Sequence, residues 1–224
     1  MTGFRVLKRL RKVTPDVVRR FRELPVANVS DSMSRLASLG ASLRPFHAGG
    51  ILAGPAVTVR TRPGDNLMIH KALDIAEPGD VVVVDGGGDL TNALIGELMI
   101  AHARRRGLAG LVIHGAVRDS AWIAAHDFPV FAAGVTHRGP YKDGPGEINV
   151  PISIGGAVIE PGDLVLGDDD GLVAVGFADV ETVYAAAKAK HDAEEQQMQA
   201  IEHGRNDRSW VDATLLRLGC KIKT

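Results

Sequence analysis

Apolar and polar residues along this chain follow two different periods in turn. Alternating or continuous apolar runs predict strands at 52–60, 81–84, 108–114 and 129–133. Helical spacing and capping residues predict helices at 15–24, 28–39, 67–75, 91–106 and 119–126. Strands that alternate with helices in this way indicate an α/β domain.

Beyond residue 134 the pattern changes to short strands and turns, and then to one long helix. Three short apolar runs between 157 and 175 predict a series of hairpins. The segment 178–203 has helical composition but few large apolar residues, so we expect it to bridge solvent or to pack on a neighbouring subunit. We predict a single domain over 1–224, with a core at about 28–177 and a C-terminal helical arm at about 178–224.

Composition and charge narrow the class of protein. The 224 residues are 45% hydrophobic and 24% charged, as in a globular protein with an apolar core. The net charge of -1 lacks the basic excess of a nucleic-acid binder, and no apolar run reaches the roughly 18 residues of a membrane span. We therefore expect neither a nucleic acid nor a membrane as a partner. The first residues lack the apolar stretch of a secretory signal and Cys220 is the only cysteine, so we expect a cytoplasmic protein without disulfides.

The segment from Asp85 to Asp119 carries the clearest candidate chemistry. A valine-rich strand leads into three glycines at 86–88, the pattern then predicts a helix, and a second strand ends in Arg118 and Asp119. In such a unit the first turn and the residues after the second strand lie at the same edge of the sheet. Glycines allow a ligand close to the backbone, and a helix N-terminus favours an anion. The segment predicts a site for a small carboxylate beside a divalent metal.

Other functions for these residues are less well supported. The glycines do not have the G-x-G-x-x-G spacing of a dinucleotide site, and no Gly-Lys-Ser/Thr follows them as in a phosphate-binding P-loop. Two purely structural roles remain open: the glycines can form a simple turn, and Arg118 and Asp119 can form a surface ion pair. The acidic run 168–170 before Gly171 lacks the spacing of a calcium loop and is more typical of a solvated turn. His70, His126 and His137 share no ligand spacing, and His137 and Lys142 are the candidates to approach the cleft.

Four segments together resemble a known family. DGGGDLTNALIGE, GAVRD, RGPYKDGPGEINVPISIGG and PGDLVLGDDDG are similar to the RraA-like family, over roughly 28–171. Its members include the class II 4-hydroxy-4-methyl-2-oxoglutarate/4-carboxy-4-hydroxy-2-oxoadipate aldolases and the RraA regulators of ribonuclease E. The resemblance implies a swivelling β/β/α domain, here with N-terminal helices and the C-terminal arm, assembled as a homotrimer or homohexamer.

The resemblance also implies roles for particular residues. The aldolase pattern of an acid, twenty positions and Arg-Asp is present as Glu97, Arg118 and Asp119. It implies that Asp119 holds the metal, that Arg118 binds the pyruvyl group and stabilises its enolate, and that Glu97 positions a metal-bound water or holds Arg118. The substrate carboxylate would meet the backbone amides of the segment Gly96, Glu97, Leu98 and Met99.

The match to the family is incomplete at two positions. Trp122 stands where the family often has a further acid, and His114 takes a position that is commonly Asp. The missing acid affects the expected support of Arg118 and leaves the substrate open. Glu194 lies about where the family places an acid donated by an adjacent subunit, and Glu195 is its rival for that role.

The chemistry of the residues points to the same reaction class. Cleaving a carbon–carbon bond beta to a carbonyl leaves an enolate whose charge must be stabilised. The glycine segment contains no lysine for a Schiff base, and Lys71 and Lys142 are the nearest candidates. Oxygen ligands favour Mg²⁺ or Mn²⁺ as the Lewis acid. We expect a metal-dependent lyase that releases pyruvate from a 4-hydroxy-2-oxo acid and decarboxylates oxaloacetate. The alternative is a non-catalytic regulator, which is expected to lack the metal-binding aspartate.

Overall fold

The computed structural model describes residues 3–36 and 38–222. Its strands are β1 (Phe4–Val6), β2 (Arg44–Pro45), β3 (Leu52–Thr61), β4 (Val81–Asp85), β5 (Ala93–Ile95), β6 (Gly110–Val117), β7 (Val130–Val135), β8 (Gly146–Ile148), β9 (Ile152–Ile154), β10 (Ala157–Ile159), β11 (Leu164–Asp168) and β12 (Gly171–Val175). Its helices are α1 (Pro15–Phe21), α2 (Val26–Ser32), α3 (Leu67–Ile75), α4 (Glu97–Arg105), α5 (Ser120–Ala124), α6 (Val180–Glu202) and α7 (Ser209–Arg217).

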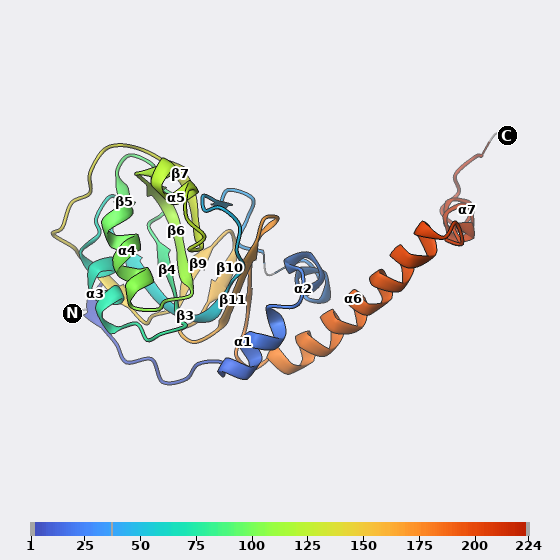
Figure 1. The fold of residues 1–224 in the computed structure, drawn as a ribbon, viewed down its shortest axis with the longest axis horizontal. Coiled ribbons are helices and arrows are strands. Elements are labelled where there is room, and N and C mark those ends of the chain that lie inside the picture. The colour runs from blue at the N-terminus through green and yellow to red at the C-terminus, as the bar shows by residue number, and fades with distance from the viewer. Residues whose placement is uncertain (1–2, 37, 223–224) are drawn as a thin grey trace.

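A ten-stranded mixed sheet forms the centre of the molecule (Figure 1). Its middle strands β3, β4, β6 and β7 are parallel, and the main path of the sheet runs β1-β8-β3-β4-β6-β7-β2. Valine, isoleucine and leucine fill these strands on both faces, as expected for parallel strands covered on each side. The α/β prediction is confirmed.

Three apolar clusters organise the layers. Helices α3, α4 and α5 cover one face of the sheet, and the β9–β10 hairpin packs on the other. Strand β11 pairs with both β3 and β12, and this extension carries α1, α2 and the start of α6. The result is a layer of helices, a sheet and a second β layer, with a further helical group at the edge.

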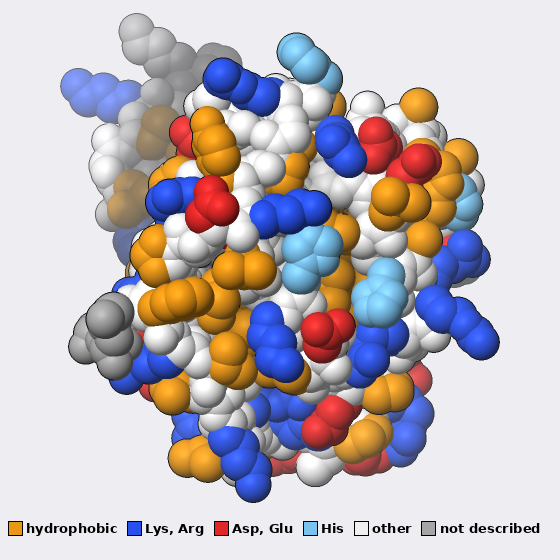
Figure 2. Space-filling model, turned by 90° about the vertical axis from the view of Figure 1, so that its left-hand side faces the viewer, with side chains coloured by type: hydrophobic (Ala, Val, Ile, Leu, Met, Phe, Trp, Pro, Cys, Tyr) orange, Lys and Arg blue, Asp and Glu red, His pale blue; other side chains and the backbone are white. Residues whose placement is uncertain are grey.

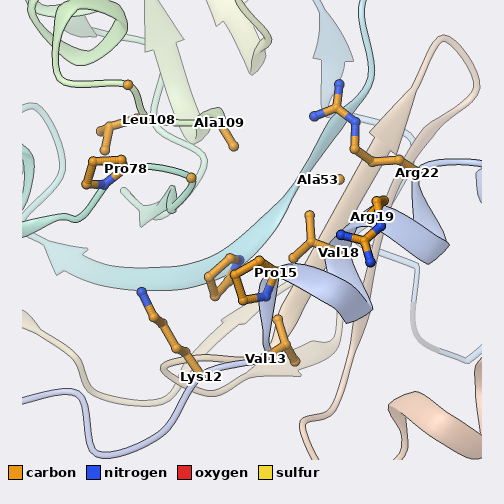
Figure 3. Close-up of a pocket in the computed structure, with 13 residues that line it drawn as sticks. Lys12, Val13, Pro15, Val18, Arg19, Arg22, Ala53, Pro78, Leu108 and Ala109 are labelled. Carbon is orange, nitrogen blue, oxygen red and sulfur yellow. The ribbon is translucent and has the colours of Figure 1, made fainter.

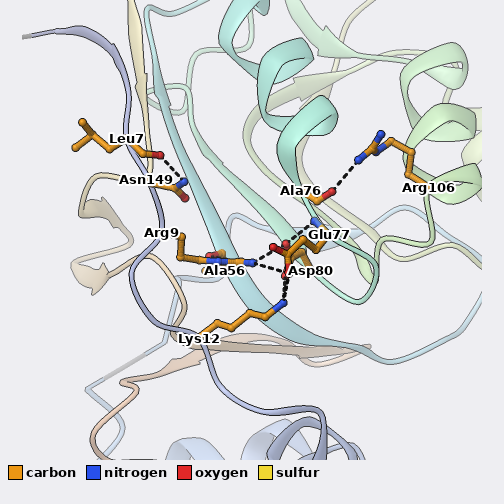
Figure 4. A network of polar contacts seen from close by, with 9 residues as sticks. All are labelled: Leu7, Arg9, Lys12, Ala56, Ala76, Glu77, Asp80, Arg106 and Asn149. Atoms are coloured by element: carbon orange, nitrogen blue, oxygen red, sulfur yellow. Dashed lines mark hydrogen bonds and ion pairs between the residues drawn. The ribbon is translucent and has the colours of Figure 1, made fainter.

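An N-terminal segment runs along the molecule before α1 and is held by charges. Arg9 donates to the fully buried Asp80 at 2.9 Å, and Asp80 also accepts from the Glu77 N–H at 2.7 Å (Figure 4). Lys12 pairs with Glu77 at 2.6 Å. These contacts tie the segment to the turn before β4. Strand β1, which the sequence pattern did not predict, extends the sheet through β8.

The predicted helix at 91–106 is wrong in its first part. Residues Ala93–Ile95 form β5, which is buried and pairs with the end of β6, and the helix begins only at Glu97. Pairing with β6 prevails over the local helical pattern because it buries three apolar side chains. The helix predicted at 28–39 is also shorter and earlier, since Ser34 and Arg35 take left-handed backbone angles (φ 56° and 62°) just after α2.

The C-terminal arm begins on the body and then leaves it. Val180, Val183 and Ala187 of α6 are buried, which corrects the expectation that this helix stays outside its own core. The rest of α6 extends away from the sheet and carries α7, which was not predicted, at its far end (Figure 1). Within the described residues no helix combines the length and the apolar character needed to cross a bilayer.

Candidate active site

The Arg118-Asp119 pair directly follows β6, beside the start of α4. Asp119 has a left-handed backbone (φ 59°), and its Oδ2 accepts the Glu97 backbone N–H at 2.9 Å. The Arg118 Nε lies 3.6 Å from the same oxygen. A side chain at position 96 would displace the pair, because a Cβ there would lie less than 3.0 Å from both Asp119 Oδ2 and Arg118 Cγ. The structure therefore brings together the three predicted residues and explains the glycine between them.

A cavity of about 320 Å³ adjoins Arg118. Its walls come from the turn before α3, from β5 and the start of α4, and from the loop after β7. The lining residues are Asn66, His70, Ala93, Leu94, Ile95, Gly96, Leu98, Met99, Arg118, Gly139, Pro140 and Lys142. None of them is acidic, and three can carry positive charge. The cavity is thus suited to an anion. Four of the five predicted substrate-binding residues lie in its wall, and Glu97 is the one outside it.

The face of the molecule shown in Figure 2 is less one-sided than the cavity. Lys, Arg and His side chains lie there among apolar ones, and several Asp and Glu side chains are interspersed. His70 lies on the cavity rim, where burial first and the charge of Lys142 second lower the pKa of its imidazole. His137 is absent from the lining. The sequence had favoured His137 and Lys142, and the structure brings Lys142 and His70 to the cavity instead.

Asp65 holds the loop that carries Lys142. The Asp65 carboxylate is fully buried and accepts the backbone N–H groups of Asp143 at 2.7 Å and Gly144 at 2.9 Å through Oδ2. Its other oxygen accepts from the Leu67 N–H at 3.0 Å, at the start of α3. Because one carboxylate ties both segments together, the cavity wall formed by the loop is fixed relative to α3.

Asn66 is a cavity residue that the motif analysis did not assign. Its Nδ2 donates to the Leu94 carbonyl at 2.9 Å, and its backbone N–H donates to the Tyr141 carbonyl at 3.0 Å. The side chain is 3% exposed, and its Oδ1 accepts no hydrogen bond from any described residue. Since a carbonyl can only accept, the Leu94 contact fixes the orientation of the amide. A cap-like residue directly before a helix gives little sign of this role in the sequence.

The three glycines at 86–88 do not form the expected anion cradle. The Gly86 and Gly88 N–H groups both donate to the His114 carbonyl at 3.1 Å, and the Gly87 N–H donates to Asp85 Oδ1 at 3.0 Å. All three amides are therefore used within the protein. The prediction was wrong because β5 intervenes, so that the glycines close a turn at the ends of β4 and β6 instead of opening a helix.

The helix N-terminus that faces the cavity belongs to α4. Of its first amides, that of Glu97 donates to Asp119 and that of Met99 donates to the Gly96 carbonyl at 3.1 Å. The Leu98 N–H has no acceptor in the part of the chain that the structure describes. This amide, together with the positive end of the helix dipole, remains available beside Arg118.

Comparison with known proteins gives the family of this chain. The model of the RraA-like family, described as Aldolase/RraA, matches residues 26–174. This chain belongs to the RraA-like family. It is 40% identical over 186 residues, 83% of this chain and 89% of the other, to a protein of Halalkalibacterium halodurans named "Putative 4-hydroxy-4-methyl-2-oxoglutarate aldolase".

Two solved structures show the same fold. An uncharacterized protein from Pseudomonas syringae pv. tomato is 26% identical with a TM-score of 0.77, and the match covers 86% of this chain and 95% of that one. RraAS2 of Streptomyces coelicolor, described as an unusual member of the RNase ES inhibitor RraA protein family, is 26% identical with a TM-score of 0.75. That match covers 83% of this chain and 96% of the other. The RraA-like family thus includes both catalytic and regulatory names.

The departures from the family motif lie outside the cavity. Trp122 stacks on His126 with ring centroids 3.9 Å apart, and it packs against the cluster beneath α4. His114 lies 3.3 Å from Asp85, beside the glycine turn. Neither lines the cavity, so the missing acid at position 122 changes the support of α5 and not the cavity wall.

Glu194 lies away from this site within one chain. Its carboxylate accepts from Asn28 Nδ2 at 2.6 Å and pairs with Lys190 at 2.9 Å. These two contacts, Asn28 first, lower the pKa of Glu194. Helix α6 leaves the body on the side opposite α4 and β5 (Figure 1). The donation of Glu194 to a site therefore requires a second copy of the chain.

Asp119 is the one carboxylate at this pair that can bind a metal ion. The described residues contain no group of three or more His, Cys, Asp or Glu side chains that could hold an ion. Asp119 offers one carboxylate oxygen beyond the one that accepts from Glu97. Mg²⁺ commonly keeps several waters and binds through one or two carboxylates and its substrate. The donor set fits such an ion, with Asp119 as the protein ligand.

Proposed function

We propose that the protein is a divalent-metal-dependent lyase that cleaves a 4-hydroxy-2-oxo acid and releases pyruvate. The observation that carries the proposal is the Arg118-Asp119 pair at the α4 N-terminus, beside a cavity that contains no acidic residue. The similarity to a protein named as an aldolase supports the same reaction class. A cavity of about 320 Å³ is at the lower end of the usual range for small-molecule sites.

The reaction requires one proton to be removed and one to be returned. The C4 hydroxyl loses its proton, the C3–C4 bond breaks, and the bonding electrons move onto the 2-oxo group to give pyruvate enolate. A carbonyl product leaves, and C3 then takes up a proton to give pyruvate. Oxaloacetate decarboxylation passes through the same enolate with CO₂ as the leaving group, so one site can serve both reactions.

The residues near Arg118 have distinct tasks in this scheme. Leu98 offers its free N–H and the α4 dipole to the pyruvyl carboxylate. Arg118 presents its guanidinium to the 2-oxo oxygen, where negative charge develops. Glu97, beside Asp119, orients the water that exchanges protons with the substrate. Asp119 holds Mg²⁺ or Mn²⁺, which when bound supplies Lewis-acid stabilisation of the enolate.

Assembly completes the proposed site. We infer a homotrimer or homohexamer in which α6 of one chain packs on the next and brings Glu194 toward the neighbouring cavity. The exposed second half of α6, which includes Met198 (57% exposed) and Ile201 (48% exposed), supports this packing. The second candidate function is that of a non-catalytic regulator, because a related structure is described as a member of the RNase ES inhibitor RraA protein family. Asp119 argues against it, since a non-catalytic protein does not need a metal ligand.

The enolate step can be tested without knowing the physiological substrate. Pyruvate in D₂O with the protein and Mg²⁺ should exchange its methyl protons, and proton NMR follows their loss. We expect exchange that requires the metal and disappears on adding EDTA. A regulator would leave the methyl signal at the uncatalysed rate, and exchange that persists in EDTA would contradict metal dependence.

A further inference from the structure

Two cations line the cavity, and only one is used in the scheme above. Arg118 follows β6 and lies 3.6 Å from Asp119. Lys142 comes from the loop after β7 and forms no ion pair with any described residue. Asp119 lies beside Arg118, whereas no described carboxylate lines the cavity to offset the charge of Lys142. A cavity wall with two cations, one of them without an acidic partner, is complementary to a ligand with two negative groups.

We propose that Lys142 binds the distal carboxylate of a dianionic 2-oxo acid and so selects dicarboxylates over monocarboxylates. This inference rests on the proposed function, because it assigns the pyruvyl end to Arg118. Asp119 lies beside Arg118 and the free Leu98 N–H lies in the same wall. The pyruvyl carboxylate therefore belongs at that wall, and the second carboxylate remains for Lys142.

The position of Lys142 is fixed even though its side chain is exposed. Tyr141 on one side exchanges backbone hydrogen bonds with the turn at 64–66, at 2.8 and 3.0 Å. Asp143 on the other side donates to the buried Asp65 at 2.7 Å. Both neighbours are thus tied to the turn before α3. A lysine on a held backbone loses less conformational entropy on binding than one on a free loop.

His70 strengthens the selectivity for a second carboxylate. Burial first and the charge of Lys142 second lower the pKa of His70, which favours the neutral imidazole. A neutral imidazole still has one ring N–H to donate. Lys142 contributes to that shift, which places its charge near the ring. One cation and one neutral donor match the two oxygens of a carboxylate.

The test compares ligands that differ at the distal group only. Calorimetry with 2-oxoglutarate and with 2-oxopentanoate, in Mg²⁺, measures binding of a dianion and of a monoanion, and neither carries the 4-hydroxyl needed for cleavage. The variants are Lys142→Met and Lys142→Arg, with Lys71→Met as a matched control, because Lys71 is an exposed lysine of α3 outside the lining. Cleavage of 4-hydroxy-2-oxoglutarate and of 4-hydroxy-2-oxopentanoate is followed on the same variants.

The expected result is a loss confined to the dianion. Lys142→Met should weaken 2-oxoglutarate binding by tenfold or more, leave 2-oxopentanoate within twofold, and shift the ratio of kcat/KM between the two substrates accordingly. Lys142→Arg should restore most of the preference, and Lys71→Met should match the wild type. Equal losses for both ligands, or no loss for either, would overturn the assignment. Selective binding without cleavage of either hydroxy acid would support this inference and contradict the proposed lyase.

Discussion

The Asp119 carboxylate accepts a 2.9 Å hydrogen bond from the Glu97 backbone N–H. The aspartate that follows β6 therefore also caps α4, the helix that begins with Glu97. The twenty positions between Glu97 and Arg118 are spanned by α4 and β6, which return the chain to its starting point. The spacing of the motif is therefore a consequence of one helix and one strand.

Asn is the informative replacement for Asp119. Asparagine tolerates a left-handed backbone and keeps an oxygen to accept the Glu97 N–H, but it loses the charge that holds a metal. We expect Asp119→Asn to retain the wild-type melting temperature and less than a tenth of metal-dependent turnover. Asp119→Ala should lose turnover and also about 1–2 kcal/mol of unfolding free energy. Alanine cannot accept the Glu97 N–H, and it is strained in a left-handed backbone conformation. Turnover near wild type in Asp119→Asn would exclude the metal role.

Arg118 is tested by keeping its charge and removing its shape. Lysine cannot present two parallel N–H groups to two oxygens. We expect Arg118→Lys to lower kcat/KM by a hundredfold or more, on the order of 3 kcal/mol, as for the loss of one preorganised oxyanion donor. The melting temperature should barely move, since the side chain is 44% exposed. A destabilised variant with retained activity per folded molecule would instead make Arg118 a structural partner of its neighbours.

Most of the parallel sheet was predictable, and the site was predictable only in part. The strands at 52–60 and 81–84 and the helix at 67–75 agree closely with β3, β4 and α3, because long apolar runs report burial directly. The start of α4 was missed because β5 is short and owes its strand form to β6. A motif in the sequence singled out Arg118 and Asp119, and the structure places both beside the start of α4. Asn66 and His70 reach the cavity only through tertiary packing, which no local pattern records.

The pKa of His70 should report occupation of the cavity. Burial and the charge of Lys142, in that order, lower this pKa in the free protein. A bound dianion next to Lys142 would offset its charge, so we expect the His70 pKa to rise when saturating 2-oxoglutarate is added. Lys142→Met should also raise the pKa in the free protein and abolish most of the ligand-induced change. NMR titration of the histidine Hε1 signals, with His70→Gln for assignment, measures the His70 pKa in the free and in the ligand-bound protein. An unchanged pKa on binding would show that the ligand does not bind next to His70.

The arm predicts the oligomeric state. Trp210, Leu216 and Leu218 are all more than 60% exposed in one chain, and α7 buries no residue of its own. We expect light scattering at micromolar concentration to give the mass of three or six chains. Truncation after residue 187, which leaves the buried start of α6 in place, should yield smaller assemblies with the sheet intact by circular dichroism. A monomeric full-length chain would contradict the packing of α6 on a neighbour and the role of Glu194.

Pyruvate release from 4-hydroxy-4-methyl-2-oxoglutarate and from oxaloacetate tests the central claim most directly. Coupling to lactate dehydrogenase measures pyruvate with Mg²⁺, with Mn²⁺ and with EDTA, using Asp119→Asn as the control. We predict that both substrates yield pyruvate, that EDTA abolishes the release and that added Mg²⁺ restores it in the wild type only. Failure to release pyruvate from either substrate with either metal, or equal release in EDTA, would contradict the assignment of a metal-dependent lyase.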